Sequence, residues 1–126
     1  MEMTQHAVSW FEISTSDFDR AKKFYETIFD YEMPEMDMGG MKMGILLHDQ
    51  ATGVGGAIIH ATGHEPCQRG TTVYLNGGQD LSVVLDRIPA AGGEVQLGKT
   101  PIGDGMGYFA IFTDSEGNRV GLHSMQ

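Results

Sequence analysis

The chain has 126 residues, 40% of them apolar, which is enough for one domain with its own core. Its net charge of −9 disfavours contact with phosphate backbones, so we do not expect nucleic acid as a partner. No stretch has the length of a membrane-spanning helix, and residues 1–6 lack the basic and apolar regions of a secretory signal. These features predict a single domain, residues 1–126, that binds neither nucleic acid nor membranes.

Cysteine usage suggests a compartment. Cys67 is the only cysteine, so the chain cannot form an intramolecular disulfide. This usage is typical of proteins kept in a reducing environment. A cytoplasmic location is therefore the default expectation.

The first predicted element is a strand over residues 8–14. Side chains alternate between the two faces of a strand, so Trp10 and Glu12 share one face. Phe11 and Ile13 share the other face, which is purely apolar and suited to packing under a helix. The strand therefore presents a mixed polar and aromatic face on its far side.

A helix of about three turns is predicted directly after this strand. Ser16 can serve as its N-cap, and Asp17 and Asp19 then lie in the first turn, where the helix dipole favours carboxylates. Its apolar stripe should cover the first strand: Phe18, Ala21, Phe24, Tyr25 and Ile28.

The remainder of the first half predicts short strands. Residues 31–38 alternate weakly, a turn follows at Gly39-Gly40, and residues 41–48 and 54–60 are typical of strands. Methionine is flexible and polarizable, so the cluster here indicates either an adaptable apolar pocket or plain core filling: Met33, Met36, Met38, Met41 and Met43.

Residues 62–70 are polar and turn-rich, and they predict a linker between two halves. The second half repeats the order of the first, which predicts two βαβββ modules at about residues 6–61 and 71–126. The predicted elements of the second module are a strand at 71–76, a helix at 80–91 ended by Gly92-Gly93, a strand at 94–97, a glycine-rich loop at 99–107, and strands at 108–113 and 119–124 joined by a turn.

The strand that opens the second module also has two unlike faces. Thr72, Tyr74 and Asn76 share one face, whereas Val73 and Leu75 share the apolar one. One such strand in each module indicates a pair of sheets that together form a concave site.

Two segments carry a family resemblance. Residues 17–25, Asp-Phe-Asp-Arg-Ala-Lys-Lys-Phe-Tyr, and residues 114–122, Asp-Ser-Glu-Gly-Asn-Arg-Val-Gly-Leu, resemble the vicinal oxygen chelate superfamily of glyoxalase I, bleomycin-resistance proteins and extradiol dioxygenases. The run at 100–109 is similar to small proteins described as related to lactoylglutathione lyase. The resemblance implies an α+β fold of two βαβββ modules with cupped mixed sheets. It also implies a homodimer.

In the metal-dependent members of that superfamily, His, Gln or Glu residues of the cupped sheets hold a divalent ion, which acts as a Lewis acid. The resemblance assigns those positions to Trp10, Thr72 and Gly121, with the fourth near Ile59 or His60. Indole, hydroxyl and glycine cannot replace such ligands. We therefore expect neither this metal site nor another cofactor, and neither glyoxalase I nor dioxygenase chemistry.

Glu12 is the candidate catalytic residue. A carboxylate that points into a methionine-lined pocket would be desolvated and could act as a general base. Alternatively, Glu12 reaches solvent at the mouth of the cup, or pairs with Arg119 or Lys42.

His60 and His123 end the two modules at nearly equivalent positions. With Glu12 they could form a displaced metal site of two histidines and one carboxylate. A one-residue slip in register would reverse each side chain, and both histidines could instead be hydrogen-bonded structural residues.

Three aromatic side chains, Trp10, Tyr74 and Tyr108, could supply walls for a flat or cationic ligand, or belong to an ordinary core. The loop at 103–107 lacks the Lys and Ser/Thr of a phosphate-binding loop and enters a strand, so it is interpreted as a rim over the pocket.

The sequence favours a small-molecule binding protein that lacks the family's metal ligands. Its predicted ligand-binding residues are Trp10, Glu12, Thr72, Tyr74, Tyr108, His60 and His123. The alternative is a lyase-like or isomerase-like enzyme with Glu12 as the base. A purely structural or interaction role is a third possibility.

Overall fold

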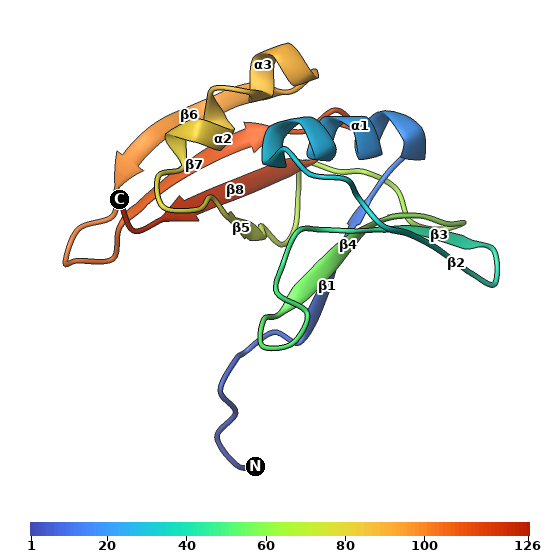
Figure 1. Cartoon of the computed structure of the whole chain (residues 1–126), viewed down its shortest axis with the longest axis horizontal. Coiled ribbons are helices and arrows are strands. Elements are labelled where there is room, and N and C mark those ends of the chain that lie inside the picture. The colour runs from blue at the N-terminus through green and yellow to red at the C-terminus, as the bar shows by residue number, and fades with distance from the viewer.

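The computed structural model describes the whole chain, residues 1–126. Its first module holds one helix and one four-stranded sheet, which we call sheet one (Figure 1). The elements of this module are β1 (Trp10–Ser14), α1 (Phe18–Phe29), β2 (Glu35–Met38), β3 (Met41–Ile45) and β4 (Gly55–His60).

The second module holds two short helices and a second four-stranded sheet, which we call sheet two. None of the helices combines the length and apolar character needed to span a bilayer. The elements of this module are β5 (Tyr74–Asn76), α2 (Ser82–Leu85), α3 (Ile88–Ala91), β6 (Glu94–Pro101), β7 (Tyr108–Thr113) and β8 (Arg119–Ser124).

The two sheets have the same topology. Sheet one has the order β1-β4-β3-β2 and sheet two the order β5-β8-β7-β6. The first strand of each module runs parallel to the last one, and the other pairs are antiparallel. The predicted α+β architecture of two βαβββ modules is therefore confirmed. The outer edges of β1 and β5 pair with no strand of the chain.

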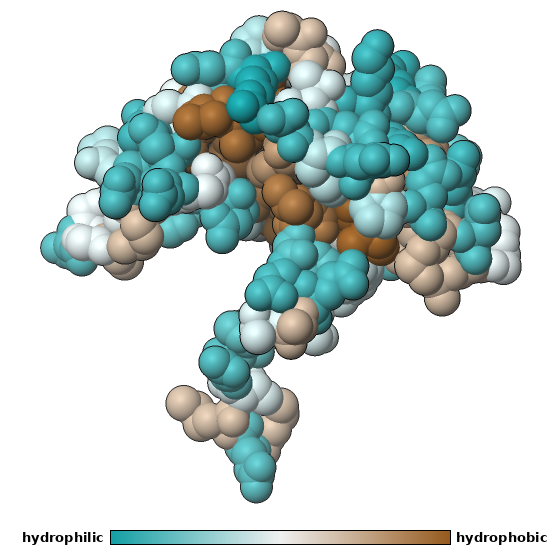
Figure 2. Space-filling view, viewed as in Figure 1, coloured by the Kyte–Doolittle hydropathy of each residue, from teal (hydrophilic) through white to brown (hydrophobic).

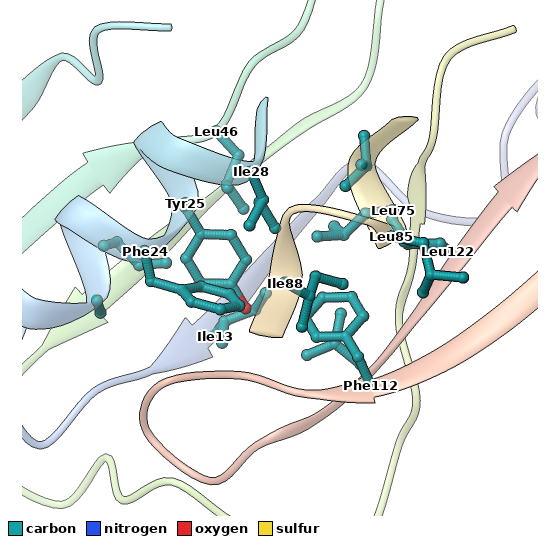
Figure 3. Packing of buried hydrophobic residues seen from close by; sticks show 14 of the residues in the cluster. Ile13, Phe24, Tyr25, Ile28, Leu46, Leu75, Leu85, Ile88, Phe112 and Leu122 are labelled. Carbon is teal, nitrogen blue, oxygen red and sulfur yellow. The ribbon is translucent and has the colours of Figure 1, made fainter. Parts of the chain in front are cut away.

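Side chains from the helix-facing sides of both sheets share one core (Figure 3). Tyr25 and Phe24 of α1 are fully buried there, and their rings meet edge to face at 4.9 Å between centroids. All three helices and both sheets contribute to this core, so the modules form one folded unit. Its labelled members are Ile13, Phe24, Tyr25, Ile28, Leu46, Leu75, Leu85, Ile88, Phe112 and Leu122.

The predicted cap of α1 was wrong by one residue. Asp17, with extended backbone, is the N-cap, because its Oδ1 accepts a hydrogen bond from the backbone N–H of Arg20 at 3.1 Å. Ser16 instead donates to a carboxylate of the second module, Glu116.

Four further elements differ from the predicted ones in their bounds. The helix expected at 80–91 is divided into α2 and α3, because Pro89 has no N–H to continue the helical hydrogen bonds. β6 extends to Pro101, so the loop comprises only residues 102–107. β5 begins at Tyr74, which leaves Thr72 outside the strand, and β1 begins at Trp10 rather than at residue 8.

Candidate functional site

The faces of the two sheets that point away from the helices are called the cup faces. On sheet one, Trp10 pairs with Gly55 and Glu12 pairs with Ala57, so both side chains lie on the cup face. The methionines of β2 and β3 extend this face. Together they form an open, mainly apolar pocket of about 520 Å³, called the methionine pocket, lined by Trp10, Glu12, Met36, Met38, Met41, Met43 and Ile45.

Glu12 has no cationic partner within 4 Å. Its one hydrogen bond comes from the indole N–H of Trp10, at 3.4 Å to Oε2. Of its two expected partners, Lys42 lies over the Phe18 ring on the helix side of the sheet, and Arg119 donates to another residue. Glu12 is exposed on the single chain, so the enclosure that sequence reasoning expected around this carboxylate is absent there.

Sheet two carries a second, more aromatic pocket of about 360 Å³, formed by Tyr74, Phe109, Ile102 and His123. The Nε2 of His123 lies 2.8 Å from the carbonyl oxygen of Met106. A carbonyl can only accept, so Nε2 carries the proton and ties the 102–107 loop to the sheet. The loop therefore forms a rim of this pocket, as its glycines indicated.

Tyr108 does not line this pocket. It packs against the shared core, and the Nζ of Lys99 lies 4.5 Å from its ring centroid. The neighbouring Phe109 faces the cup, where its ring lies 6.3 Å from that of Tyr74. Sequence reasoning missed Phe109 and Ile102. Alternation with the buried Phe112 could have indicated Phe109.

A crevice separates the two pockets where the modules adjoin. Trp10 on β1 and Tyr74 on β5 both line it, and apolar side chains reach the surface near this centre of the molecule (Figure 2). The unpaired edges of both strands lie along the same crevice. The two cup faces are therefore neighbours but are not closed over one another.

One carboxylate joins the modules on the helix side. Oε1 of Glu116 accepts hydrogen bonds from the backbone N–H groups of Ser16 and Asp17, at 3.0 and 2.7 Å. Its Oε2 accepts one from Nε of Arg20 at 2.7 Å. Burial alone would raise the pKa of Glu116, but the Arg20 guanidinium and these donors lower it to about 2. The sequence holds no local signal for a pair 100 residues apart.

A buried hydrogen-bond network adjoins the Glu116 carboxylate and its donors. Asp114 accepts hydrogen bonds from the Tyr25 hydroxyl at 2.8 Å and from the backbone and side-chain N–H groups of Asn118. Burial raises the pKa of Asp114, although those hydrogen bonds oppose the rise. Burial and the nearby Asp114 charge likewise raise the pKa of Tyr25. These groups hold the modules together, since Tyr25 belongs to the first module and Asp114 to the second.

Comparison with known proteins identifies the family. The model of the glyoxalase/bleomycin resistance protein/dioxygenase superfamily matches residues 7–122. The chain belongs to this superfamily. A protein named "Putative glyoxylase CFP32" from Mycobacterium bovis is 29% identical over 125 residues, which are 96% of this chain and 46% of that protein. The chain thus spans about half the length of the curated relatives it matches.

Solved structures share the fold at low identity. Glyoxalase I from Zea mays matches with a TM-score of 0.65 and 18% identity, over 92% of this chain and 43% of that one. A glyoxalase/bleomycin resistance protein from Albidiferax ferrireducens matches with a TM-score of 0.62 and 17% identity, over 94% and 98%. The fosfomycin resistance protein FosX from Listeria monocytogenes matches with a TM-score of 0.62 and 18% identity, over 96% and 92%.

The residues at the positions to which the superfamily resemblance assigns metal ligands do not fit a divalent ion. A side chain at Gly121 would meet the ring of Tyr74, which lies across this glycine. Thr72 accepts a hydrogen bond from Arg119 at 3.0 Å. Trp10 offers only an indole N–H donor, and Ile59 is apolar.

The two histidines and Glu12 lie apart within the chain. His60 pairs with Lys42 on the helix side of sheet one, and its Nδ1 lies 3.2 Å from the carbonyl oxygen of Thr15. His123 belongs to sheet two. A displaced site of these three residues does not form in the single chain.

Proposed function

We propose that this protein binds a small apolar molecule in the methionine pocket, without the superfamily's metal ion. The observation that carries the proposal is the composition of the lining: six of its seven residues are hydrophobic. Three of them remain substantially exposed, Trp10 by 41%, Met36 by 49% and Met38 by 57%. Contiguous exposed apolar patches of this kind commonly mark surfaces that bind a ligand or a partner.

Thioether side chains suit such a role. Each methionine can change rotamer at low cost, so the pocket can adapt to ligands of different shape. The floor of the pocket is more rigid than its walls, because Ile45, Ala57 and Ile59 are buried there. The pocket thus combines a rigid base with adaptable walls.

A thermal-shift screen of small organic molecules tests this proposal, followed by calorimetric titration of each stabilising compound. We expect Trp10→Ala and Met36→Ser to weaken binding by roughly tenfold or more, because each removes a wall of the pocket. Val83→Ser is the matched control, since Val83 is 54% exposed but lies on α2, on the helix side. A screen without any stabilising compound, or hits that bind both pocket variants with unchanged affinity, would contradict the proposal.

The metal-free character has a separate test. Incubation with Mn²⁺, Ni²⁺ or Zn²⁺, followed by desalting and elemental analysis, should leave far less than one equivalent of metal per chain. One tightly bound equivalent that is lost on substitution of Glu12, His60 or His123 would overturn this part of the proposal.

We further propose that a second copy of the chain closes the pocket in a homodimer. The support is the open cup face of sheet one together with the unpaired edges of β1 and β5. Analytical ultracentrifugation should give a dimer for the wild type and a shift toward monomer for Met38→Glu. A strictly monomeric wild type would contradict the dimer and leave the ligand-binding proposal in place.

A further inference from the structure

The charge of the methionine pocket is confined to one group. Glu12 is the only charged residue among those that line it. Its Oε2 accepts the weak hydrogen bond from Trp10, while Oε1 has no hydrogen-bond partner in the structure. Oε1 is therefore left to solvent on the open chain.

A ligand that fills the pocket displaces this water. An ionised carboxylate that has neither water nor a partner is strongly unfavourable. A neutral ligand must therefore either leave Glu12 hydrated or cause it to take up a proton. An anionic ligand adds repulsion. A ligand that brings a protonated amine replaces the lost water with a charge-assisted hydrogen bond.

From this arrangement we propose that Glu12 makes the methionine pocket selective for protonated amines carried on a flat apolar body. The inference rests on the proposed small-molecule function and names the class of ligand. The ammonium group binds Oε1 of Glu12, and the apolar body lies over Met43 and Ile45.

Trp10 contributes in two ways. Its indole N–H holds Oε2 of Glu12, which orients the carboxylate along the edge of the pocket. Its ring face attracts a cation, and the neighbouring thioethers are polarizable. The residue that positions the carboxylate therefore also forms part of the cation's surroundings.

Nearby cations do not neutralise Glu12. Arg69 and Arg119 line a crevice of about 210 Å³ that Glu12 also borders, together with the acidic Glu65. Neither guanidinium lies within 4 Å of Glu12, and Arg119 is held by Thr72 at 3.0 Å. The carboxylate thus remains available to a ligand cation.

Three compounds with one shared body test the inference: 2-naphthylmethylamine, 2-naphthalenemethanol and 2-naphthoic acid. Calorimetric titration of the wild type at pH 7 should rank the amine first, roughly tenfold or more above the alcohol, and the acid last. Glu12→Gln should abolish the preference for the amine and strengthen the binding of the alcohol, because a neutral amide costs less to desolvate than an ionised carboxylate. Glu94→Gln is the matched control, because it removes the same charge from an exposed site at the start of β6.

The outcomes separate this inference from the function beneath it. If none of the three compounds binds in the methionine pocket, the proposed function fails with them. If the alcohol binds as tightly as the amine, the selectivity fails and the function stands. The role of Glu12 would be overturned if the preference for the amine survived Glu12→Gln, or if Glu94→Gln reduced it equally. The preference would then come from the overall charge of −9.

Discussion

The buried contact between the modules on the helix side and the cup face of sheet one differ in how their carboxylates are paired. On the helix side, the Asp114 carboxylate is buried and accepts hydrogen bonds from Tyr25 and Asn118. On the cup face, the Glu12 carboxylate has a single weak partner amid exposed apolar side chains. The buried carboxylate on the helix side is thus fully paired, whereas the cup face keeps apolar side chains and a poorly paired carboxylate exposed to solvent. We infer from this contrast that the helix side stabilises the fold, whereas the cup face is the surface on which we propose that a ligand binds.

The largest effect is expected from Asp114→Ala. The substitution leaves the Tyr25 hydroxyl and the Asn118 donors unpaired in the core, which should lower the free energy of unfolding by about 3–5 kcal/mol. Urea denaturation followed by far-UV circular dichroism measures it, with Asp104→Ala in the exposed loop as the control. A loss below about 1 kcal/mol would show that this network is not the source of stability.

Glu116→Ala should have the next largest effect, a loss of about 2–3 kcal/mol, because it leaves the backbone N–H groups of Ser16 and Asp17 and the Arg20 guanidinium without their acceptor. The pKa of Glu116 is lowered from 4.5 to about 2, so the ionised form stabilises the fold. That contribution is fully present above pH 4.5 and is lost as the pH falls toward 2.

Denaturation at a series of pH values checks the sign. The stability of the wild type should fall between pH 5 and pH 3 more steeply than that of Glu116→Gln, which cannot ionise. Parallel curves for the two proteins would contradict the assigned role of the carboxylate.

Gly121→Ala tests how closely the Tyr74 ring packs against sheet two. The new Cβ would collide with the ring of Tyr74, so the ring must move. Because Tyr74 is half exposed, we expect a modest loss of about 1–2 kcal/mol. In a double-mutant cycle, Tyr74→Ala should relieve most of this cost, whereas additive losses would show that the contact is not the cause.

The smallest effect on stability is expected from Trp10→Phe. Trp10 lies on the exposed cup face, so unfolding should change by no more than about 0.5 kcal/mol. Affinity for 2-naphthylmethylamine should nevertheless fall about two- to fivefold, because the indole N–H and the stronger cation–π face are lost. Equal losses in stability and in binding would remove the distinction between the two regions.

Periodicity along the chain predicted the repeat and the opposite faces of β1, because Phe11 and Ile13 alternate with the polar Glu12. The same rule failed on β7, where Phe109 and Tyr108 are both aromatic and each face of the strand is apolar. The burial of Phe112 in the shared core is what assigns Tyr108 to the helix side by alternation, and Phe109 to the cup. Local patterns also could not show that Ser16 caps nothing in its own module, since its partner Glu116 is brought there by the tertiary fold.

The proposed closure of the pocket by a second copy would depend on contacts between chains, which no local pattern in the sequence encodes. Alternation along β1 predicted that Glu12 lies on the cup face, where it lines the methionine pocket, but it could not show that this carboxylate is exposed on the open chain. The chemistry of this residue is therefore a question for binding experiments.

The most direct measurement is a crystal structure of the protein saturated with 2-naphthylmethylamine. The account predicts the naphthalene ring against the methionines of sheet one, with the ammonium nitrogen about 3 Å from a carboxylate oxygen of Glu12. A ligand found instead between Tyr74 and Phe109, or bound in the methionine pocket with its nitrogen turned away from Glu12, would contradict it.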